Sequence, residues 1–301
     1  MNNNLTSTVI ICTRNRITDI LTFLDSLAQQ TAQPTEIIIV DSSDIKITED
    51  PLFSQKFTPH YFAQSKLIYT HTAPGLTYQR NQGITLATGD VMYFFDDDVK
   101  LAPDYVQNMQ SIFAQNPHYG GGMGTISNIE PTRFTFFRLM RILFLLQRDA
   151  SSGNFTYSGM PTHPYGKHDF KTVQVLGGCC MAFRSWVFDK HQFDENLRFY
   201  GYMEDCDFSR RVSRDFPLFY NPQAQLEHHN SPLNRDKVVD NRAMFMRNYR
   251  YLYFKNFYSK NKFTLIAHYW SILGLFVEAL FVLRNKNYLV GYIKGLFLSP
   301  F

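Results

Sequence analysis

The sequence predicts an α/β fold in which helices flank a mainly parallel, Rossmann-like sheet. Short apolar runs with the length of buried strands alternate with longer segments whose apolar residues recur every three or four positions. Such alternation implies right-handed crossovers between neighbouring parallel strands. With 301 residues, the chain is at the upper limit of one α/β domain, or contains one domain and an appendage.

The expected elements follow in order along the first hundred residues. Ile20, Leu21, Leu24 and Leu27 recur at helical spacing after the first apolar run, and a second helix is expected over 77–87. The expected strands are 8–12, 36–40, 66–70 and 91–95.

Polar side chains directly follow three of these strands. Thr13 and Arg14 come after the first strand, Asp41 after the second, and Asp96–Asp98 after the fourth. Because ligands bind at the carboxyl ends of the strands in open α/β sheets, we expect a ligand site at this edge.

The three consecutive carboxylates of Asp96–Asp98 are the most informative feature. Adjacent like charges at the end of a buried strand repel one another and resist leaving water. A hard divalent cation with oxygen ligands, and with a phosphate on its far side, would stabilise them. An acidic turn without a ligand is the alternative.

Composition argues against several classes of protein. The net charge of +4 comes without a long Lys/Arg block or zinc-finger spacing, so no nucleic acid partner is expected. No CxxC pair is present, and the adjacent Cys179 and Cys180 are poor disulfide partners, which indicates reduced thiols and a cytosolic compartment. No signal peptide is expected from the first residues.

The middle of the chain is less regular. Residues 120–124 contain four glycines and are expected to form a turn or loop. Segment 134–148 is basic and amphipathic, with Arg138, Arg141 and Arg148 on one helical face. It predicts either a core helix with outward arginine stems or a membrane-surface helix.

The composition changes after about residue 235. Residues 263–283 are nearly all apolar and long enough for a span of roughly 20 residues. However, Thr264, His268, Ser271 and Glu278 share one stripe, and a carboxylate within a span costs roughly 2.5–3.5 kcal/mol. We therefore favour a helix that lies on a membrane or packs against the domain. Basic residues on both flanks suit an anionic leaflet.

Two further groups suit a ligand that carries a diphosphate and a sugar. Asp41 can accept a hydrogen bond from a nucleobase or ribose, unless it caps a helix or turn. Arg80 and Asn81 can contact phosphate or sugar oxygens, unless they lie on a solvated helix face.

A second acidic segment, 201–211, has three acids within four positions, followed by two arginines. Transfer of a sugar to a hydroxyl requires a base for the hydroxyl proton and neutralisation of the leaving diphosphate. Asp205 is the candidate base and Glu204 is expected to orient the acceptor. A salt-bridged helix start is the alternative.

Taken in order, these motifs resemble glycosyltransferase family two. The motifs that carry the resemblance are 9–16, 39–43, 75–83, 95–98, 178–184 and Glu204-Asp205, within roughly the first 230 residues. The family has the GT-A fold, and its members invert the anomeric centre in one displacement. The resemblance implies a GT-A domain at 1–235, with a nucleotide-binding half at 1–100 and an acceptor half at 101–235. A helical extension, expected to associate with a membrane, would follow at 236–301.

The resemblance also implies roles on the donor side. Thr13 and Arg14 would line the base and phosphate pocket, Asp41 would hold the base, and Asp96 would contact the ribose or sugar. The implied nucleotide-sugar-binding residues are Thr13, Arg14, Asp41, Arg80, Asn81, Asp96 and Asp97.

On the metal and acceptor side, the resemblance assigns Asp98 to Mn²⁺ or Mg²⁺. The family often supplies a downstream histidine to the metal, and His228 is the candidate, with His229 as the close alternative; imidazole suits Mn²⁺. Asp205 would be the catalytic base. The loop that contains Gly178 and Cys179 would lie beneath the acceptor.

The resulting interpretation is a metal-dependent, inverting transferase of a hexosyl or deoxyhexosyl group. The donor would be a UDP-, dTDP- or GDP-sugar, and the acceptor a glycan or lipid-linked hydroxyl in cell-surface polysaccharide synthesis. The Gln-x-x-Arg-Trp segment of polymerising members is missing, which favours transfer of a single sugar. The aromatic, basic tail predicts a cytoplasmic protein that is peripheral at the inner face of the cell membrane.

Two interpretations from other classes stay open. A nucleotidyltransferase would have a glycine-rich phosphate loop after the first strand, but residues 13–16 contain no glycine. A non-catalytic sugar-nucleotide scaffold would not need the acids Asp98 and Asp205.

Overall fold

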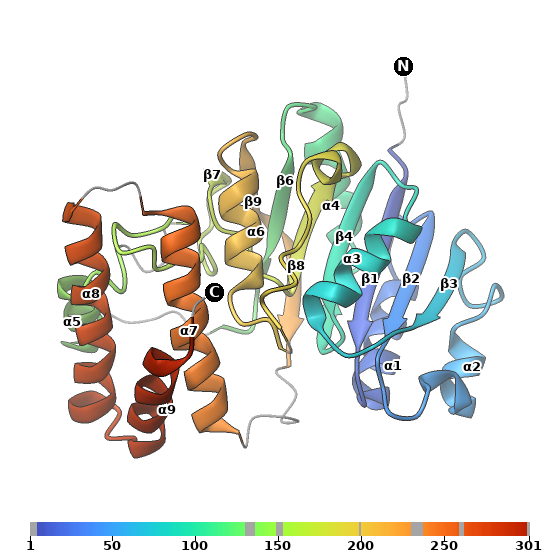
Figure 1. Ribbon diagram of the computed structural model, residues 1–301. Coiled ribbons are helices and arrows are strands. Elements are labelled where there is room, and N and C mark those ends of the chain that lie inside the picture. Colours follow the sequence, from blue (N-terminus) through green and yellow to red (C-terminus); the bar gives the residue numbers. More distant parts are fainter. Residues whose placement is uncertain are drawn as a thin grey trace.

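The structure is a computed structural model that describes residues 5–129, 136–148, 153–198, 200–229, 237–258 and 262–299 (Figure 1). It confirms the predicted α/β fold. The strands are β1 (Ser7–Thr13), β2 (Glu36–Asp41), β3 (Lys66–His71), β4 (Val91–Asp96), β5 (Val99–Leu101), β6 (Gly121–Ile126), β7 (Lys171–Val173), β8 (Cys180–Arg184) and β9 (Leu218–His228).

The helices connect these strands and continue beyond them. They are α1 (Ile17–Ala28), α2 (Pro51–Lys56), α3 (Leu76–Leu86), α4 (Tyr105–Gln115), α5 (Phe136–Leu143), α6 (Glu204–Val212), α7 (Val238–Asn256), α8 (Lys262–Val277) and α9 (Lys286–Phe297). A π-helical segment, Glu278–Val282, continues α8, and short 3-10 segments lie at Ile47–Glu49 and Ser185–Asp189.

One sheet contains all of these strands, in the order β3-β2-β1-β4-β8-β6-β9-β5, with β7 paired to β9. The pairings from β3 to β4 are parallel, as predicted for the first hundred residues. Beyond β4 the sheet is mixed, because β8 runs antiparallel to both β4 and β6. All carboxyl ends of the first four parallel strands therefore meet at one edge.

Alternating side chains of β4 show how the two faces of the sheet are covered. The ring of Phe94 contacts Phe193 at 5.4 Å between centroids, on the face that carries α3 and α6 (Figure 1). The ring of Phe95 contacts Phe23 of α1 at 5.6 Å and Tyr105 of α4 at 5.4 Å. Because successive strand residues point to opposite faces, this apolar run is buried on both sides.

The glycine-rich segment at 120–124 is a buried strand, β6, and the expectation of a turn or loop is wrong. The reason is close packing. A Cβ atom on Gly122 would lie 2.3 Å from the ring of Phe219, and one on Gly124 would lie 2.3 Å from the Ala224 carbonyl oxygen. The missing side chains make room for an aromatic ring and a neighbouring backbone.

Helix α8 buries the polar side chains His268 and Ser271 and exposes several apolar ones, although Ile272 and Leu275 are also buried. His268 and Ser271 are fully buried, and His268 Nδ1 donates a hydrogen bond to the Ser158 carbonyl oxygen at 3.1 Å. Ile266 and Phe281 are 68% and 72% exposed. The stripe predicted from the sequence is therefore real, but it faces the protein. By length and composition alone, Lys262–Val282 could cross a membrane.

Helix α5 lies within the predicted amphipathic segment 134–148, of which residues 134 and 135 are outside the described residues. The segment is neither entirely buried in the core nor entirely exposed at the surface. Phe144 and Leu146 are buried, whereas Leu143 is 62% exposed. Arg141 reaches inward and contacts the buried carboxylate of Glu278 at 2.7 Å, which ties α5 to the C-terminal helices.

Replacing Arg141 with methionine should therefore destabilise the protein. The Arg141→Met variant keeps the apolar stem but leaves the buried Glu278 carboxylate without this cation. We expect the free energy of unfolding to fall by about 2–3 kcal/mol, somewhat less than for a fully buried pair. Urea unfolding measures it.

The matched control is Lys294→Met, which breaks a similarly short ion pair, 2.6 Å to Asp240, between two exposed side chains. Its cost should be about 0–1 kcal/mol. Equal losses in the two variants would contradict a stabilising role for the buried pair.

Candidate active site

Three ligand-type side chains converge at the carboxyl edge of the sheet. Asp96 ends β4, Asp98 follows it, and His228 ends β9. Their candidate ligand atoms all lie within 4.8 Å of one another. Two carboxylates and one imidazole are a donor set that fits Mn²⁺ or Mg²⁺.

Strand pairing brings His228 to the acids although 130 residues separate it from Asp98 in sequence. The antiparallel β5–β9 pair places Val99 opposite His228. The imidazole Nε2 atom lies 3.1 Å from Asp98 Oδ1. His229, in contrast, is about half exposed and contacts Glu227. The structure thus brings the preferred histidine, and not its neighbour, to Asp98.

The middle aspartate lies behind this cluster. Asp97 is 3% exposed, and its oxygens accept hydrogen bonds from Thr13 Oγ1 at 2.6 Å and Arg16 Nη1 at 2.9 Å. Burial raises the pKa of Asp97 to about 7, although Arg16 opposes the shift. Neither Asp97 nor the buried Thr13 is placed for a direct donor contact here. Instead, these two side chains stabilise the acidic turn from its buried side.

Arg16 was missed in the sequence and contributes more than its neighbour Arg14. It contacts Asp97 and also lies 3.7 Å from Asp98 Oδ2. Arg14 is about half exposed and pairs with Asp44 at the surface. The signal was present, since Arg16 belongs to the same polar turn after β1, but spacing alone does not show which arginine turns inward.

Asp41 is fully buried at the end of β2. Its Oδ1 atom accepts from the Ser43 N–H at 2.8 Å, and its Oδ2 atom accepts from the Ile47 N–H at 3.0 Å and the Tyr69 hydroxyl at 2.9 Å. These bonds order the loop after β2. Contact between this carboxylate and a base would require them to rearrange, so the turn-capping alternative describes this conformation.

Arg80 connects the cluster of Asp96, Asp98 and His228, here called the metal-type cluster, to the second acidic segment. Its guanidinium is buried, contacts Glu204, lies 3.4 Å from Asp96 Oδ1, and donates to the Gly178 carbonyl oxygen at 2.9 Å. Burial raises the pKa of Glu204 to about 8, and the attraction of Arg80 works against that shift. Arg80 therefore positions acids and a loop instead of facing solvent for phosphate.

Asn81 has a bracing role as well. Its side-chain amide donates to the Phe193 carbonyl oxygen at 3.0 Å and to Glu195 at 2.8 Å, and its oxygen accepts from the Phe193 N–H at 3.0 Å. Because each polar atom of this amide has a partner, Asn81 holds segment 193–195 against α3.

Asp205 lies at the start of α6 and keeps partial access to solvent, with 18% side-chain exposure. Its oxygens accept from the N–H groups of Gly178 at 2.9 Å and Cys206 at 2.8 Å. Burial acts to raise the pKa of Asp205, but His163, the Gly178 N–H and the Cys206 side chain outweigh it and lower the pKa below its ordinary value. The carboxylate is thereby kept ionised, as a base requires.

The loop before β8 supports this carboxylate through its backbone. A Cβ atom on Gly178 would lie 2.9 Å from Glu204 Oε1, so a larger residue would disturb both acids. Cys179 is buried, with its sulfur 3.9 Å from the Tyr165 hydroxyl. Of the two predicted acceptor-side residues, Gly178 contacts Asp205 directly, and Cys179 follows it in the same loop and contacts Tyr165.

His163 is a second residue that sequence reasoning missed. Its Nε2 atom lies 3.8 Å from Asp205 Oδ2, and its ring stacks on Tyr165 at 5.3 Å with nearly parallel planes. It comes from an irregular segment without a periodic pattern, and only the folded chain brings it to α6.

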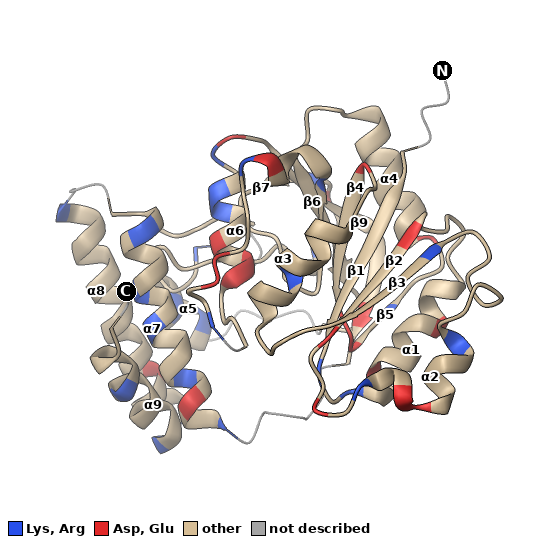
Figure 2. Cartoon of the chain, turned by 45° about the vertical axis from the view of Figure 1, so that its right-hand side comes forward, with Lys and Arg blue, Asp and Glu red and all other residues tan. Residues whose placement is uncertain are grey.

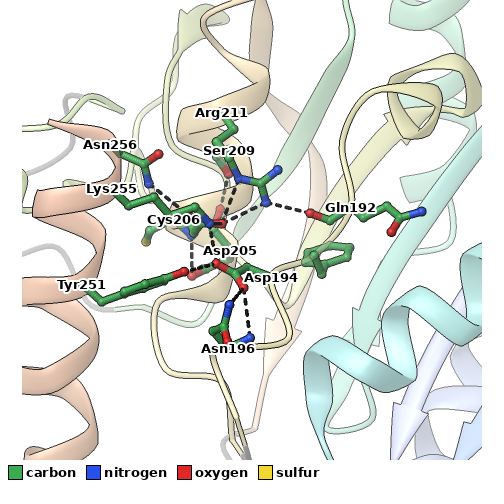
Figure 3. A network of polar contacts seen from close by, with 12 residues as sticks. Gln192, Asp194, Asn196, Asp205, Cys206, Ser209, Arg211, Tyr251, Lys255 and Asn256 are labelled. Atoms are coloured by element: carbon green, nitrogen blue, oxygen red, sulfur yellow. Dashed lines mark hydrogen bonds and ion pairs between the residues drawn. The ribbon is translucent and has the colours of Figure 1, made fainter. Parts of the chain in front are cut away.

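Helix α6 is anchored on its other side by the polar network in Figure 3. Asp194 accepts from the Tyr251 hydroxyl at 2.6 Å and contacts Lys255 at 2.5 Å. Lys255 also contacts the buried Asp207 at 2.9 Å, while Arg211 pairs with Asp207 and donates to the Gln192 carbonyl oxygen. The network fixes α6, and with it Asp205, against α7.

Comparison with known proteins gives a family. The model for Glycosyl transferase family 2 matches residues 8–192. An amylovoran biosynthesis glycosyltransferase of Erwinia amylovora is 26% identical over 178 residues, which cover 58% of this chain and 52% of the relative. An uncharacterized glycosyltransferase of Haemophilus influenzae is 30% identical over 111 residues, covering 36% and 35%. The chain thus spans about a third to a half of the length of these two relatives.

Solved structures show the same architecture at low identity. A mannosyltransferase from Pyrobaculum calidifontis in complex with GDP-Man and Mn²⁺ has a TM-score of 0.61 at 13% identity, over 98% of this chain and 88% of that one. GalNAc-T7 with UDP, GalNAc and Mn²⁺ has a TM-score of 0.58 at 14% identity, over 92% and 58%. The fold is GT-A, and the chain belongs to glycosyl transferase family 2, as its motifs predicted.

Proposed function

We propose that this protein is a metal-dependent, inverting glycosyltransferase that moves one sugar from a nucleoside-diphosphate sugar to a hydroxyl of a glycan or lipid-linked acceptor. The observation that carries the proposal is the pairing of two sites through Arg80. One is the Asp96–Asp98–His228 donor set, and the other is the ionised, partly accessible Asp205. Family membership supports the reaction class.

In this proposal Asp205 accepts the proton of the acceptor hydroxyl. The hydroxyl oxygen bonds to the anomeric carbon as the bond from that carbon to the diphosphate oxygen breaks, and the nucleoside diphosphate leaves. Attack opposite the leaving group inverts the centre. Gly178 and Cys206 hold the carboxylate by their N–H groups, and Glu204 is held by Arg80, which leaves Asp205 as the acid with access to an acceptor.

The metal, Mn²⁺ or Mg²⁺, would be held by Asp98 and His228, with Asp96 beside them. When bound, it would neutralise charge on the leaving diphosphate. Arg16 keeps this cluster ordered by its contacts with Asp97 and Asp98. The proposed donor is a UDP-, dTDP- or GDP-sugar, and support for this class comes from structural neighbours in complex with UDP or with GDP-Man.

We also propose that the protein is cytoplasmic and peripheral at the inner face of the cell membrane, where it would serve polysaccharide synthesis. Support comes from α8 and its continuation, which expose apolar side chains such as Ile266 and Phe281. The charged residues of these two segments are Lys262 and Glu278, and most of the α8 ribbon is tan in Figure 2. Exposed apolar faces flanked by cations suit an anionic lipid surface.

The proposed donor class is tested by thermal unfolding with UDP, dTDP and GDP, each with and without Mn²⁺. A ligand that binds the folded state raises the unfolding temperature in proportion to RT ln(1 + [L]/Kd). We expect a rise for one nucleotide that depends on the metal. No rise with any nucleotide would contradict the donor proposal.

Asp205→Asn should lower kcat by about 10²–10⁴-fold, the range for loss of a general base. Nucleotide binding should persist, because Asp205 contacts no donor-side group. Release of nucleoside diphosphate measures turnover. The matched control is Asp189→Asn, an exposed acid outside the site; unchanged turnover in Asp205→Asn would remove the proposed base.

His228→Asn should weaken Mn²⁺ affinity by at least about tenfold, since even loss of a residue that only supports metal ligands costs 10–100-fold. His229→Asn, which changes an exposed imidazole next to it in sequence, should bind Mn²⁺ like the unmodified protein. Calorimetric titration with Mn²⁺ distinguishes them. Equal affinities would exclude His228 as a ligand.

The membrane proposal predicts that Ile266→Asn with Phe281→Asn releases the protein from anionic vesicles in a sedimentation assay. Leu52→Asn on α2 is the control. Leu52 is an exposed apolar side chain as well, with 56% exposure, but it lies beside the sheet and away from α8. Sedimentation that is the same in both variants would show that α8 does not mediate binding.

A further inference from the structure

A cavity of about 600 Å³ lies at the opposite end of α6 from Asp205. Its walls come from the C-terminal ends of α6 and α7, the start of α8 and segment 155–157. Arg210 lies five residues beyond Asp205, which is about 7.5 Å along a helix axis. Figure 2 shows this polarity, with acidic residues at one end of α6 and basic residues at the other. The cavity is therefore separate from the metal-type cluster.

Four cations line this cavity, namely Arg148, Arg210, Arg214 and Lys255. No acid lines it among the residues that the structure describes. Lys255 is neutralised by Asp194 and by the fully buried Asp207, which lies behind the wall. The three arginines have no such carboxylate partner in the described parts of the chain. Like charges gathered in a concave space destabilise the fold unless an anion joins them.

The arginines are held in place by rings and backbone. The Arg210 guanidinium lies 4.7 Å from the ring centroid of Phe257 and 5.7 Å from that of Phe155. Its Nε atom is buried without a hydrogen-bond partner. Arg214 donates to the Asn256 carbonyl oxygen, and Arg148 lies over the ring of Tyr157.

The electrostatics agree with an anion that completes the site. Burial, and then repulsion from Arg214, lower the pKa of the Arg210 guanidinium below its usual range. An anion between the two would oppose this lowering, because its charge attracts both guanidinium groups. Tyr157 and Tyr258 also line the cavity, and a tyrosine hydroxyl can donate a hydrogen bond to an anion.

We propose that this cavity is a binding site for a phosphate group, held by the arginine forks of Arg148, Arg210 and Arg214. Guanidinium groups bind phosphate oxygens by paired N–H donors, and the volume is within the range of small-molecule sites, roughly 300–1,000 Å³. The phosphate belongs either to a soluble compound or to the headgroup of an anionic lipid, because the apolar outer face of α8 begins at the rim, where the Phe263 ring lies 6.1 Å from that of Tyr157. The site goes beyond the proposed sugar transfer and does not depend on it.

Calorimetric titration with inorganic phosphate tests the site, with EDTA present so that the sheet-edge cluster holds no metal. The unmodified protein should bind phosphate. Arg214→Gln and Arg148→Gln should each weaken binding by about tenfold, the loss expected for one charge-assisted hydrogen bond. Arg148 is exposed, so its variant should fold normally even if changes in the packed Arg210 do not.

Lys66→Gln is the matched control, because it removes one exposed cation at the far edge of the sheet. It should bind phosphate like the unmodified protein. Absence of binding by the unmodified protein, or equal affinities in all variants, would overturn the proposal.

Sedimentation with phosphatidylcholine vesicles, with and without phosphatidylglycerol, identifies the source of the phosphate. If phosphatidylglycerol enhances binding of the unmodified protein but not of the two arginine variants, and inorganic phosphate competes, the ligand is a lipid headgroup. If the variants lose phosphate binding but respond to phosphatidylglycerol as the unmodified protein does, the ligand is a soluble phosphate compound. Both results support the site.

Discussion

Arg80 lies buried between the two acidic parts of the site, where it contacts Asp96, Glu204 and the Gly178 carbonyl oxygen. Each contact fixes something different: a strand end, a helix start and the loop that holds Asp205. A buried charge without partners is very unfavourable, and breaking a buried pair costs about 3–5 kcal/mol. One guanidinium thus sets the distance between Asp96 and the loop that holds Asp205, and the surrounding acids neutralise its buried charge.

The need to give each buried charge a partner also explains how the remaining acids are arranged. Asp97 is enclosed by Thr13 and Arg16, whereas Asp98 faces His228. Thus Asp97 stabilises the turn, while the ligand-type atoms of Asp96, Asp98 and His228 lie within 4.8 Å of one another, as the proposed cation site requires. Helix α6 carries a related cost, because Met203 before it has a left-handed backbone, φ 68°, a strain typical of functional sites. The α6–α7 network offsets this strain by holding the helix in place.

The C-terminal helices also pack against the segments around α6, although they lie outside the sheet. The second hydrophobic cluster joins α7, α8 and α9 to segments around α6. Within it, the Tyr249 hydroxyl contacts Ser158 and Ser271, and the ring of Tyr253 stacks on His268. His268 and Ser271 of α8 form hydrogen bonds inside this bundle, although His268 Nε2 has no partner among the described residues, and the outer face of α8 is apolar. The proposed contact of α8 with lipid is therefore compatible with the packing of its inner face in this bundle.

The sequence by itself determined the parallel half of the sheet, the family and the positions of the polar segments that form the candidate site. Apolar runs of strand length, and the polar residues directly after them, are local patterns that can be recognised from the sequence alone. Only the tertiary structure decided which of these residues meet. It chose His228 through the β5–β9 register, turned Arg16 inward in place of Arg14, and brought His163 from an irregular segment to Asp205. It also made a strand of a glycine run and turned the polar stripe of α8 inward, because packing partners far away in sequence set burial.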